Sequence, residues 1–295
     1  MRSSRNSRVK QGEPHRSQTV DPKRDRGHRQ KVLYVIGIGP GSPDHLSKRA
    51  RDILKSVDTV AGYTTYIDLV RPLIADKKVI STTMTKEVER VEAAINTALD
   101  GNSCAIISSG DPGIYAMAGL VFEMCKLKEI PIRPLSFDER TLDGESALQV
   151  EVVPGIPALC AGASLLGAPL THDFAVISLS DLLTPWDLIE KRIEAAARAD
   201  FVIVIYNPKS KKRSTQLEKA QKIVLQHRDQ NTPVGIVTGA MRKNQDVQIV
   251  SLKALHEAAV NMQTTLFIGS SASVKYLDFM VTPRGYAKKY RIDSE

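Results

Sequence analysis

The sequence predicts an α/β protein with two α/β domains, a mostly parallel sheet in the N-terminal domain and a mixed sheet in the C-terminal domain. Apolar, β-rich runs alternate with amphipathic helical patterns through the first half, which is typical of parallel strands joined by crossover helices. Two successive strand patterns, at 233–238 and 246–250, have no helix between them, so the second sheet should be mixed. The length of 295 residues allows two domains with sizeable cores.

The first domain should alternate strands with helices. Its clearest element is a helix over 85–100, in which Val88, Val91 and Ile95 recur at helical spacing. The remaining elements follow from shorter patterns of the same kinds. Strands are expected at 31–36, 58–61, 78–81 and 103–107, and further helices at 43–56, 66–74 and 113–127.

A stretch rich in proline, aspartate and glycine, residues 131–149, interrupts this alternation. We therefore expect an N-terminal domain over 31–148, with 134–148 as a linker or insertion, and a C-terminal domain over 149–290. A short tail, 291–295, should follow. The second domain should contain strands at 149–153, 174–179, 201–206, 233–238, 246–250 and 264–269, and helices at 158–166, 185–199, 214–227 and 251–259.

The positive charge of the chain is concentrated at its N-terminus. The net charge is +8, and residues 1–30 carry seven Arg and two Lys against three acidic residues. This segment has no aromatic residue and cannot bury enough apolar surface to fold, so it should be a disordered basic tail. The rest of the chain is close to neutral and poor in aromatic residues, which argues against a nucleic-acid-binding module.

The composition also predicts the compartment. No apolar run approaches the roughly 20 residues that span a bilayer, and residues 1–30 lack the apolar core of a signal peptide. We therefore expect a cytoplasmic protein without membrane contact. Three widely spaced cysteines, Cys104, Cys125 and Cys160, and six scattered histidines show no metal-ligand spacing. These features predict a reducing compartment and no bound metal.

Three turns rich in glycine and proline carry the functional signal, and each follows a predicted strand. They read Gly-Ile-Gly-Pro-Gly-Ser at 37–42, Ser-Ser-Gly-Asp-Pro-Gly-Ile-Tyr at 108–115, and Pro-Gly-Ile-Pro at 154–157. Open α/β sheets hold their ligands at the carboxyl ends of strands. The first turn departs from a dinucleotide fingerprint, because Ser42 replaces the last glycine and no acidic residue ends the second strand. An NAD-dependent oxidoreductase is therefore disfavoured.

The three motifs GxGPG, GDP and PGI, in this order, resemble those of the tetrapyrrole methylase superfamily, the class III S-adenosylmethionine (SAM)-dependent methyltransferases. Further stretches resemble the precorrin-3B C(17)-methyltransferase subfamily. These stretches are AGYTTY at 61–66, MTKEVER at 84–90, ISLSDLLTPW at 177–186, YNPKSKKR at 206–213 and VTPRGY at 281–286. The resemblance covers about residues 31–290.

The resemblance implies SAM-dependent methylation of carbon 17 of the macrocycle with ring contraction, in cobalamin biosynthesis, by a homodimer that binds SAM between its two domains. It leaves open whether the macrocycle carries cobalt. The alternatives are methylation at another ring carbon, or modification of diphthine or ribosomal RNA. Matching the motifs position by position implies cofactor contacts from Pro40, Ser109, Gly110, Asp111, Ile114, Pro157, Ala158, Asn207 and Ala240.

The implied substrate has many carboxylate arms, which basic side chains at the rim of the cleft should attract. The candidates are Lys209, Lys211, Lys212, Arg213, Arg242, Lys243 and Arg284, with Lys211, Arg213 and Arg284 as the main ones. No catalytic dyad or triad is apparent. None is required, because the methyl group of SAM is already activated and the protein mainly has to align the reactants. Tyr63 and Glu87 are weak candidates for a general base, since they lie in subfamily-typical segments.

Overall fold

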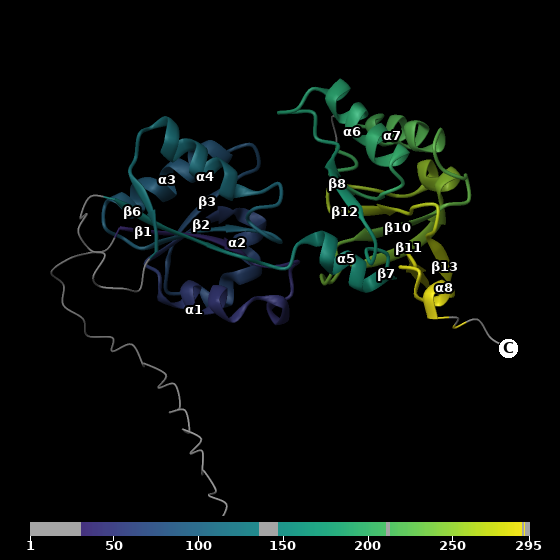
Figure 1. Cartoon of the computed structure of the whole chain (residues 1–295). Coiled ribbons are helices and arrows are strands. Elements are labelled where there is room, and N and C mark those ends of the chain that lie inside the picture. Colours follow the sequence, from purple (N-terminus) through teal and green to yellow (C-terminus); the bar gives the residue numbers. More distant parts are fainter. Residues whose placement is uncertain (1–30, 136–146, 211–212, 291, 293–295) are drawn as a thin grey trace, which may run out of the picture.

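The computed structural model describes residues 31–135, 147–210, 213–290 and 292. The predicted basic tail, most of the predicted insertion at 134–148, and Lys211 lie outside these residues. The described chain forms two α/β lobes that lie side by side, one built on a parallel sheet and the other on a mixed sheet (Figure 1). The predicted fold class is confirmed.

The first lobe contains a six-stranded sheet whose neighbouring strands all run parallel. In spatial order the strands are β3 (Lys78–Thr82), β2 (Thr59–Tyr63), β4 (Cys104–Ser108), β1 (Val32–Gly37), β6 (Leu148–Val153) and β5 (Ile132–Pro134). Every residue of β4 is buried, because helices cover both faces of the sheet.

The helices of the first lobe divide between the two faces. One face is covered by α3 (Glu87–Leu99) and α4 (Met117–Leu127), and the other by α1 (Lys48–Ser56) and α2 (Thr64–Val70) (Figure 1). Two short 3₁₀ helices, η1 (Pro43–His45) and η2 (Arg71–Leu73), flank α1 and α2. Side chains of β4 alternate between the two cores, with Ile106 on the α3 side and Ile107 on the α1 side.

The chain changes direction across this sheet between β1 and β4. From β1 it moves outward to β2 and β3, returns to β4, and then passes to β5 and β6 on the other side of β1. The helices that follow β1 and β4 lie on opposite faces of the sheet. The carboxyl ends of these two neighbouring strands therefore form a topological switch point, where sheets of this kind bind their ligands.

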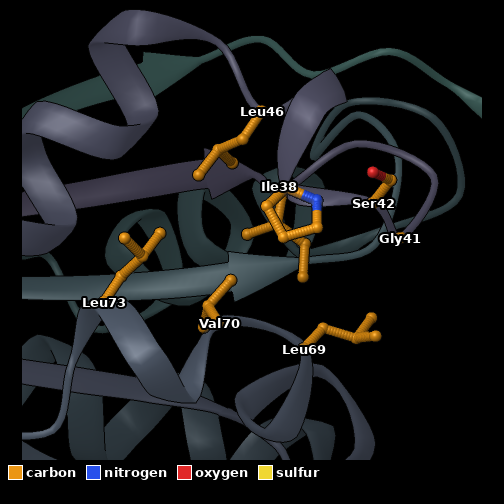
Figure 2. Close-up of a pocket in the computed structure, with 8 residues that line it drawn as sticks. Ile38, Gly41, Ser42, Leu46, Leu69, Val70 and Leu73 are labelled. Atoms are coloured by element: carbon orange, nitrogen blue, oxygen red, sulfur yellow. The ribbon is translucent and has the colours of Figure 1, made fainter.

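A small apolar hollow lies between the loop after β1 and helix α2 (Figure 2). Its lining residues are Ile38, Gly41, Ser42, Pro43, Leu46, Leu69, Val70 and Leu73. The single polar side chain among them, Ser42, uses its hydroxyl to accept the N–H of Asp44 (3.2 Å) at the start of η1. A site that orients a polar ligand needs convergent polar groups, so this hollow is not assigned as the functional site.

The strand at 148–153 corrects the predicted domain boundary. β6 pairs in parallel with β1, with Leu33 opposite Val150, and so belongs to the first sheet. A boundary between residues 148 and 149 would cut the first sheet, and the chain instead leaves this lobe at 154–157. The proline-rich stretch before β6 connects two strands of one sheet, a relation that its local composition does not reveal.

The second lobe contains a five-stranded mixed sheet. In spatial order the strands are β11 (Asp246–Ser251), β10 (Pro233–Thr238), β12 (Thr264–Ile268), β9 (Val202–Tyr206) and β8 (Phe174–Ser178). The pair β8–β9 is parallel and the other pairs are antiparallel, including the predicted pair β10–β11. One face is covered by α6 (Trp186–Arg198), α7 (Gln216–Leu225) and the 3₁₀ helix η4 (Leu252–Glu257), and the other by α5 (Ala158–Leu166) (Figure 1).

A small third sheet extends the second lobe. It consists of β13 (Val274–Tyr276), β14 (Phe279–Val281) and β7 (Gly167–Ala168), and a short helix α8 (Tyr286–Tyr290) follows. The sequence patterns predict neither these elements nor β5, because strands of two or three residues are too short to show a period. The helix expected at 251–259 is the shorter η4.

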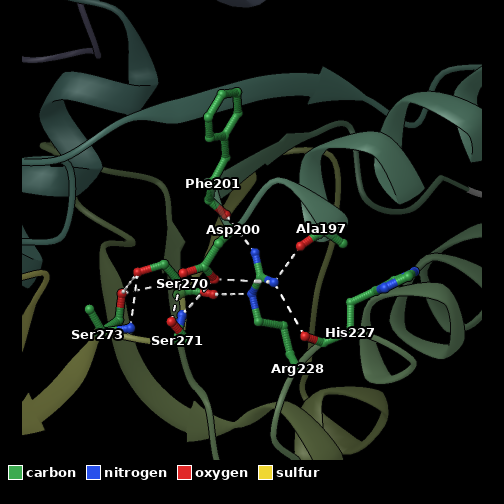
Figure 3. A network of polar contacts seen from close by, with 10 residues as sticks. Ala197, Asp200, Phe201, His227, Arg228, Ser270, Ser271 and Ser273 are labelled. Atoms are coloured by element: carbon green, nitrogen blue, oxygen red, sulfur yellow. Dashed lines mark hydrogen bonds and ion pairs between the residues drawn. The ribbon is translucent and has the colours of Figure 1, made fainter.

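A buried arginine joins the ends of several elements in the second lobe (Figure 3). Arg228 donates to the carbonyls of Ala197 and Phe201 (3.2 Å), and its guanidinium lies 3.2 Å from the carboxylate of Asp200. Asp200 in turn accepts the N–H (2.9 Å) and the hydroxyl (2.6 Å) of Ser271. Arg228 therefore satisfies the carbonyl of Ala197 in the last turn of α6 and, through Asp200, links this end of the helix to the loop after β12.

Replacing Arg228 with methionine is expected to lower the free energy of unfolding by about 2–3 kcal/mol, because buried carbonyl acceptors would lose their donor. Urea denaturation would measure the change. Arg198→Met is the matched control, since Arg198 is exposed on α6 and the same charge is removed. A loss for Arg228→Met no larger than that for Arg198→Met would contradict this structural role.

Candidate functional site

The three turns predicted from the sequence meet at the carboxyl edge of the parallel sheet. Turn 1 (37–42) follows β1, turn 2 (108–115) follows β4, and turn 3 (154–157) follows β6. Gly39 and Gly110 exchange two main-chain hydrogen bonds, with N···O distances of 3.1 and 2.7 Å. Turns 1 and 2 are thus paired beyond the ends of their strands.

Turn 3 packs on the other two turns so closely that it requires glycine. A Cβ on Gly155 would lie 2.2 Å from the carbonyl oxygen of Gly110 and 2.8 Å from that of Gly37. Gly110 has a φ of 69°, and a Cβ on it would lie 3.5 Å from Cα of Pro157 and 3.7 Å from N of Ala158. Three of the predicted cofactor contacts, Gly110, Pro157 and Ala158, therefore lie together.

The carboxylate of Asp111 fastens turn 2 to turn 3. Its Oδ1 accepts the N–H of Gly113 (2.8 Å), and its Oδ2 accepts the N–H of Gly155 (3.1 Å). Both oxygens are occupied by main-chain donors, so the side chain shapes the turns.

The second lobe presents its own carboxyl edge through β8, β9 and β10, which run in the same direction. Asn207 follows β9 with a φ of 52°, and its Nδ2 donates to the hydroxyl of Ser178 at the end of β8 (2.9 Å). Ala240 follows β10 between Gly239 (φ 59°) and Met241 (φ 59°). Non-glycine residues at positive φ store strain and cluster at binding sites, which makes this edge a candidate for ligand contact.

Two residues of turn 2 contact the second lobe. Ile114 packs on the apolar cluster of that lobe which contains Leu159 and Phe267. Tyr115, at a φ of 52°, donates its hydroxyl to the carbonyl of Val176 (3.0 Å), and its ring lies 5.4 Å from that of Tyr206. These contacts join the turn 2 segment to β8 and β9.

Tyr206 holds the start of α5, the helix that follows turn 3. Its hydroxyl oxygen accepts the N–H of Leu159 (2.9 Å). Burial raises the pKa of Tyr206 to about 12, so the phenol stays protonated at neutral pH and keeps its own proton to donate. The roles of Tyr115 and Tyr206 were not predicted, because their partners come from distant parts of the chain.

The last two predicted contacts of the first lobe, Pro40 and Ser109, share one partner. Arg242, from the loop after β10, donates through Nε to the carbonyl of Pro40 (2.7 Å) and through Nη2 to the hydroxyl of Ser109 (2.8 Å). The second lobe thus contacts turns 1 and 2 directly. Of the nine predicted cofactor contacts, seven lie on the three turns or at the first residue of α5, and Asn207 and Ala240 follow strands β9 and β10 of the second lobe.

The weak general-base candidates lie near the same edge. Tyr63 ends β2, and its ring lies 5.2 Å from that of Tyr66; Glu87 begins α3, and its carboxylate accepts the N–H of Thr85 (3.2 Å). Burial raises the pKa of Tyr66, and the positive charge of Arg242 opposes this rise. The charge of Glu87 also acts on Tyr66, so this phenol lies within electrostatic range of both Glu87 and Arg242.

The structure does not place the main substrate-binding candidates at the three turns. Lys211 lies outside the described residues. Arg213 is buried, lies 3.7 Å from the Asp181 carboxylate and donates to the carbonyl of Asn207 (3.3 Å), so it supports the loop after β9 and does not form an exposed rim. Arg284 donates to the carbonyl of Thr171 (3.4 Å). Thr171 follows the C-terminal end of α5, whereas turn 3 precedes the N-terminal end of that helix, so the structure does not bring Arg284 to the turns.

In the described part of the chain, no three side chains of His, Cys, Asp or Glu gather in a group that could hold a metal ion. Within the same residues, no helix is both long and apolar enough to cross a membrane.

The fold and the site together define a two-lobed α/β protein whose glycine turns pack against the strand ends of a second, mixed sheet. The chain belongs to the Tetrapyrrole (Corrin/Porphyrin) Methylases, because the model of that family matches residues 32–256.

Similar proteins are consistent with this membership. The chain is 46% identical over 261 residues to the cobalt-factor III methyltransferase of Priestia megaterium, a match that covers 88% of this chain and 46% of that protein. It therefore spans about half the length of that relative. It is 43% identical over 255 residues to the probable cobalt-factor III C(17)-methyltransferase of Salmonella typhimurium, covering 86% of this chain and 99% of that protein. The crystal structure of the methyltransferase CobJ superposes with a TM-score of 0.74 at 29% identity, covering 85% of this chain and 99% of that one.

Proposed function

We propose that the chain transfers a methyl group from SAM to carbon 17 of precorrin-3B, or of its cobalt-containing equivalent, with ring contraction, in cobalamin biosynthesis. The observation that carries this proposal is the meeting of three glycine turns at the switch point of the parallel sheet, against the strained strand ends of the second lobe. The similarity to a probable cobalt-factor III C(17)-methyltransferase, along 99% of its length, supports the choice of carbon.

The main-chain groups of the turns suit this cofactor. SAM, when bound, supplies a methyl group already activated on a sulfonium. Gly110 and turn 3, whose main chains pack against each other, would contact it through main-chain groups. Asn207 and Ala240 would contact it from the second lobe. Alignment of the two reactants in this way can lower the barrier by roughly 7–11 kcal/mol.

In the transfer step, the macrocycle carbon would form a bond to the methyl carbon as the methyl–sulfur bond breaks. The electron pair of that bond stays on sulfur, and S-adenosylhomocysteine leaves as a neutral thioether. Tyr63 and Glu87 remain the candidates for moving protons during ring contraction; the ring of Tyr63 contacts that of Tyr66, and the charge of Glu87 acts on the same phenol.

A homodimer in the cytoplasm is part of the same proposal. The hairpin β13–β14 exposes Tyr276, Leu277 and Phe279 by 65%, 71% and 49%, which is apolar surface that a second copy would cover. Light scattering should then report twice the chain mass of 32.4 kDa, and a mass of one chain would contradict the dimer.

The function is tested by incubating the protein with methyl-labelled SAM and the trimethylated tetrapyrrole precursor, with and without cobalt. We expect one labelled methyl group at carbon 17 of a ring-contracted product, located by carbon NMR. Label at another ring carbon would support the alternative methylase. Label only in RNA or protein, or no transfer to either macrocycle, would contradict the proposal.

A further inference from the structure

Arg242 is the side chain that crosses from the second lobe into the turns of the first. Its stem lies against turn 1, where a Cβ on Gly41 would come within 2.7 Å of the Arg242 Cγ. The main chain at Arg242 is fixed as well. The N–H of Arg242 donates to the carbonyl of Gly239 (2.9 Å), and the N–H of Met241 donates to the side chain of Gln245 (2.9 Å). The guanidinium is therefore held in place from both lobes.

The hydrogen bonds of this guanidinium leave its charge unbalanced. The bonds through Nε and Nη2 go to a carbonyl and a hydroxyl, the groups of Pro40 and Ser109, which are both neutral. Among the residues that the structure describes, no carboxylate forms an ion pair with Arg242. The bonds also occupy only one edge of the fork, and the edge formed by Nη1 and Nη2 keeps donors for a further ligand.

The surroundings favour an anion at this place. Arg242 is partly buried, and its positive charge acts on the phenol of Tyr66, as does that of the buried Arg90. Tyr63 and Glu87 act on the same phenol in the opposite sense. A preset guanidinium without a counter-ion, with two N–H donors side by side, matches the planar geometry of a carboxylate.

We propose that Arg242 binds a carboxylate arm of the tetrapyrrole through this second edge, while its first edge holds turns 1 and 2 in register. The inference rests on the proposed function and adds a specific residue for substrate recognition. The amino-acid carboxylate of SAM offers the same chemistry, so the test has to separate the two sources.

The test compares Arg242→Met and Arg242→Lys with Arg198→Met, which removes an exposed charge from α6. Absorbance titration gives the dissociation constant for the tetrapyrrole precursor, and calorimetry gives that for S-adenosylhomocysteine. We expect Arg242→Met to weaken tetrapyrrole binding by about 10-fold or more, as for a lost charge-assisted pair. Arg242→Lys should recover part of this loss, and Arg198→Met should bind as the wild type does.

A second readout distinguishes a charge contact from a merely structural one. The difference between the wild type and Arg242→Met should shrink as the salt concentration rises, because salt screens the guanidinium–carboxylate attraction. Unchanged tetrapyrrole binding, a salt-independent difference, or a loss of S-adenosylhomocysteine affinity as large as that of the tetrapyrrole would overturn the assignment. If the wild type methylates carbon 17 and Arg242→Met still binds the tetrapyrrole normally, this inference fails alone. If the wild type binds no tetrapyrrole, the proposed function fails with it.

Discussion

Replacing Gly155 with alanine is expected to weaken SAM binding by at least about 100-fold, or about 2.7 kcal/mol. The added Cβ would lie 2.2 Å from the oxygen of Gly110 and 2.8 Å from the carbonyl of Gly37. Both neighbours are main chain, so neither can rotate away, and the three turns would have to separate. Overpacking of this kind also costs about 1–3 kcal/mol of stability. Calorimetric titration with S-adenosylhomocysteine and urea denaturation would measure the two effects.

Gly119→Ala is the matched control for this substitution. Gly119 lies exposed on α4, and a Cβ there meets no atom within 4 Å. Alanine is the better helix former, so stability should stay the same or rise by up to about 1 kcal/mol, and cofactor binding should not change. Normal binding by Gly155→Ala would show that close packing of turn 3 is not needed for the site.

Asp111→Leu should reduce SAM affinity by a similar factor while the protein still unfolds cooperatively. The leucine side chain has no acceptor for the N–H groups of Gly113 and Gly155, so turn 2 would lose its tie to turn 3. Two unsatisfied donors at a partly exposed position should cost about 1–3 kcal/mol of stability, which a lobe of this size can absorb.

Asp111→Asn provides the graded comparison. Its amide oxygen can still accept the N–H of Gly113, but its NH₂ group would face the N–H of Gly155, so its affinity should lie between those of the wild type and Asp111→Leu. Asp76→Asn, an exposed carboxylate paired with Lys77, should have no effect. Equal affinity for all four proteins, measured by calorimetry, would refute the role given to Asp111.

The elements that could be predicted from sequence are those with a local signal. The helix at 158–166 has the predicted bounds, because Pro157 precedes it and Gly167, at a φ of 107°, ends it. The pair β10–β11 also followed from two strand patterns separated by a short turn. Such signals depend only on residues close in the sequence, so they can be interpreted without knowledge of the fold.

The features that could not be predicted depend on distant partners. The place of β6 is decided by β1, which lies more than a hundred residues earlier in the chain. The basic stretch around Arg213 suggests a surface cation, but the side chain is buried, where it pairs with Asp181 and donates to the carbonyl of Asn207. Likewise, Arg242 is one basic residue among several until the pairing of the lobes places it between turns 1 and 2.

The most direct test of the central claim is a crystal structure with S-adenosylhomocysteine bound. The account predicts a single molecule at the carboxyl edge of the parallel sheet, contacting Gly110 of turn 2, Pro157 and Ala158 after turn 3, and Asn207 and Ala240 of the second lobe. A ligand bound elsewhere, for example in the apolar hollow beside α2, or one that contacts a single lobe, would contradict it.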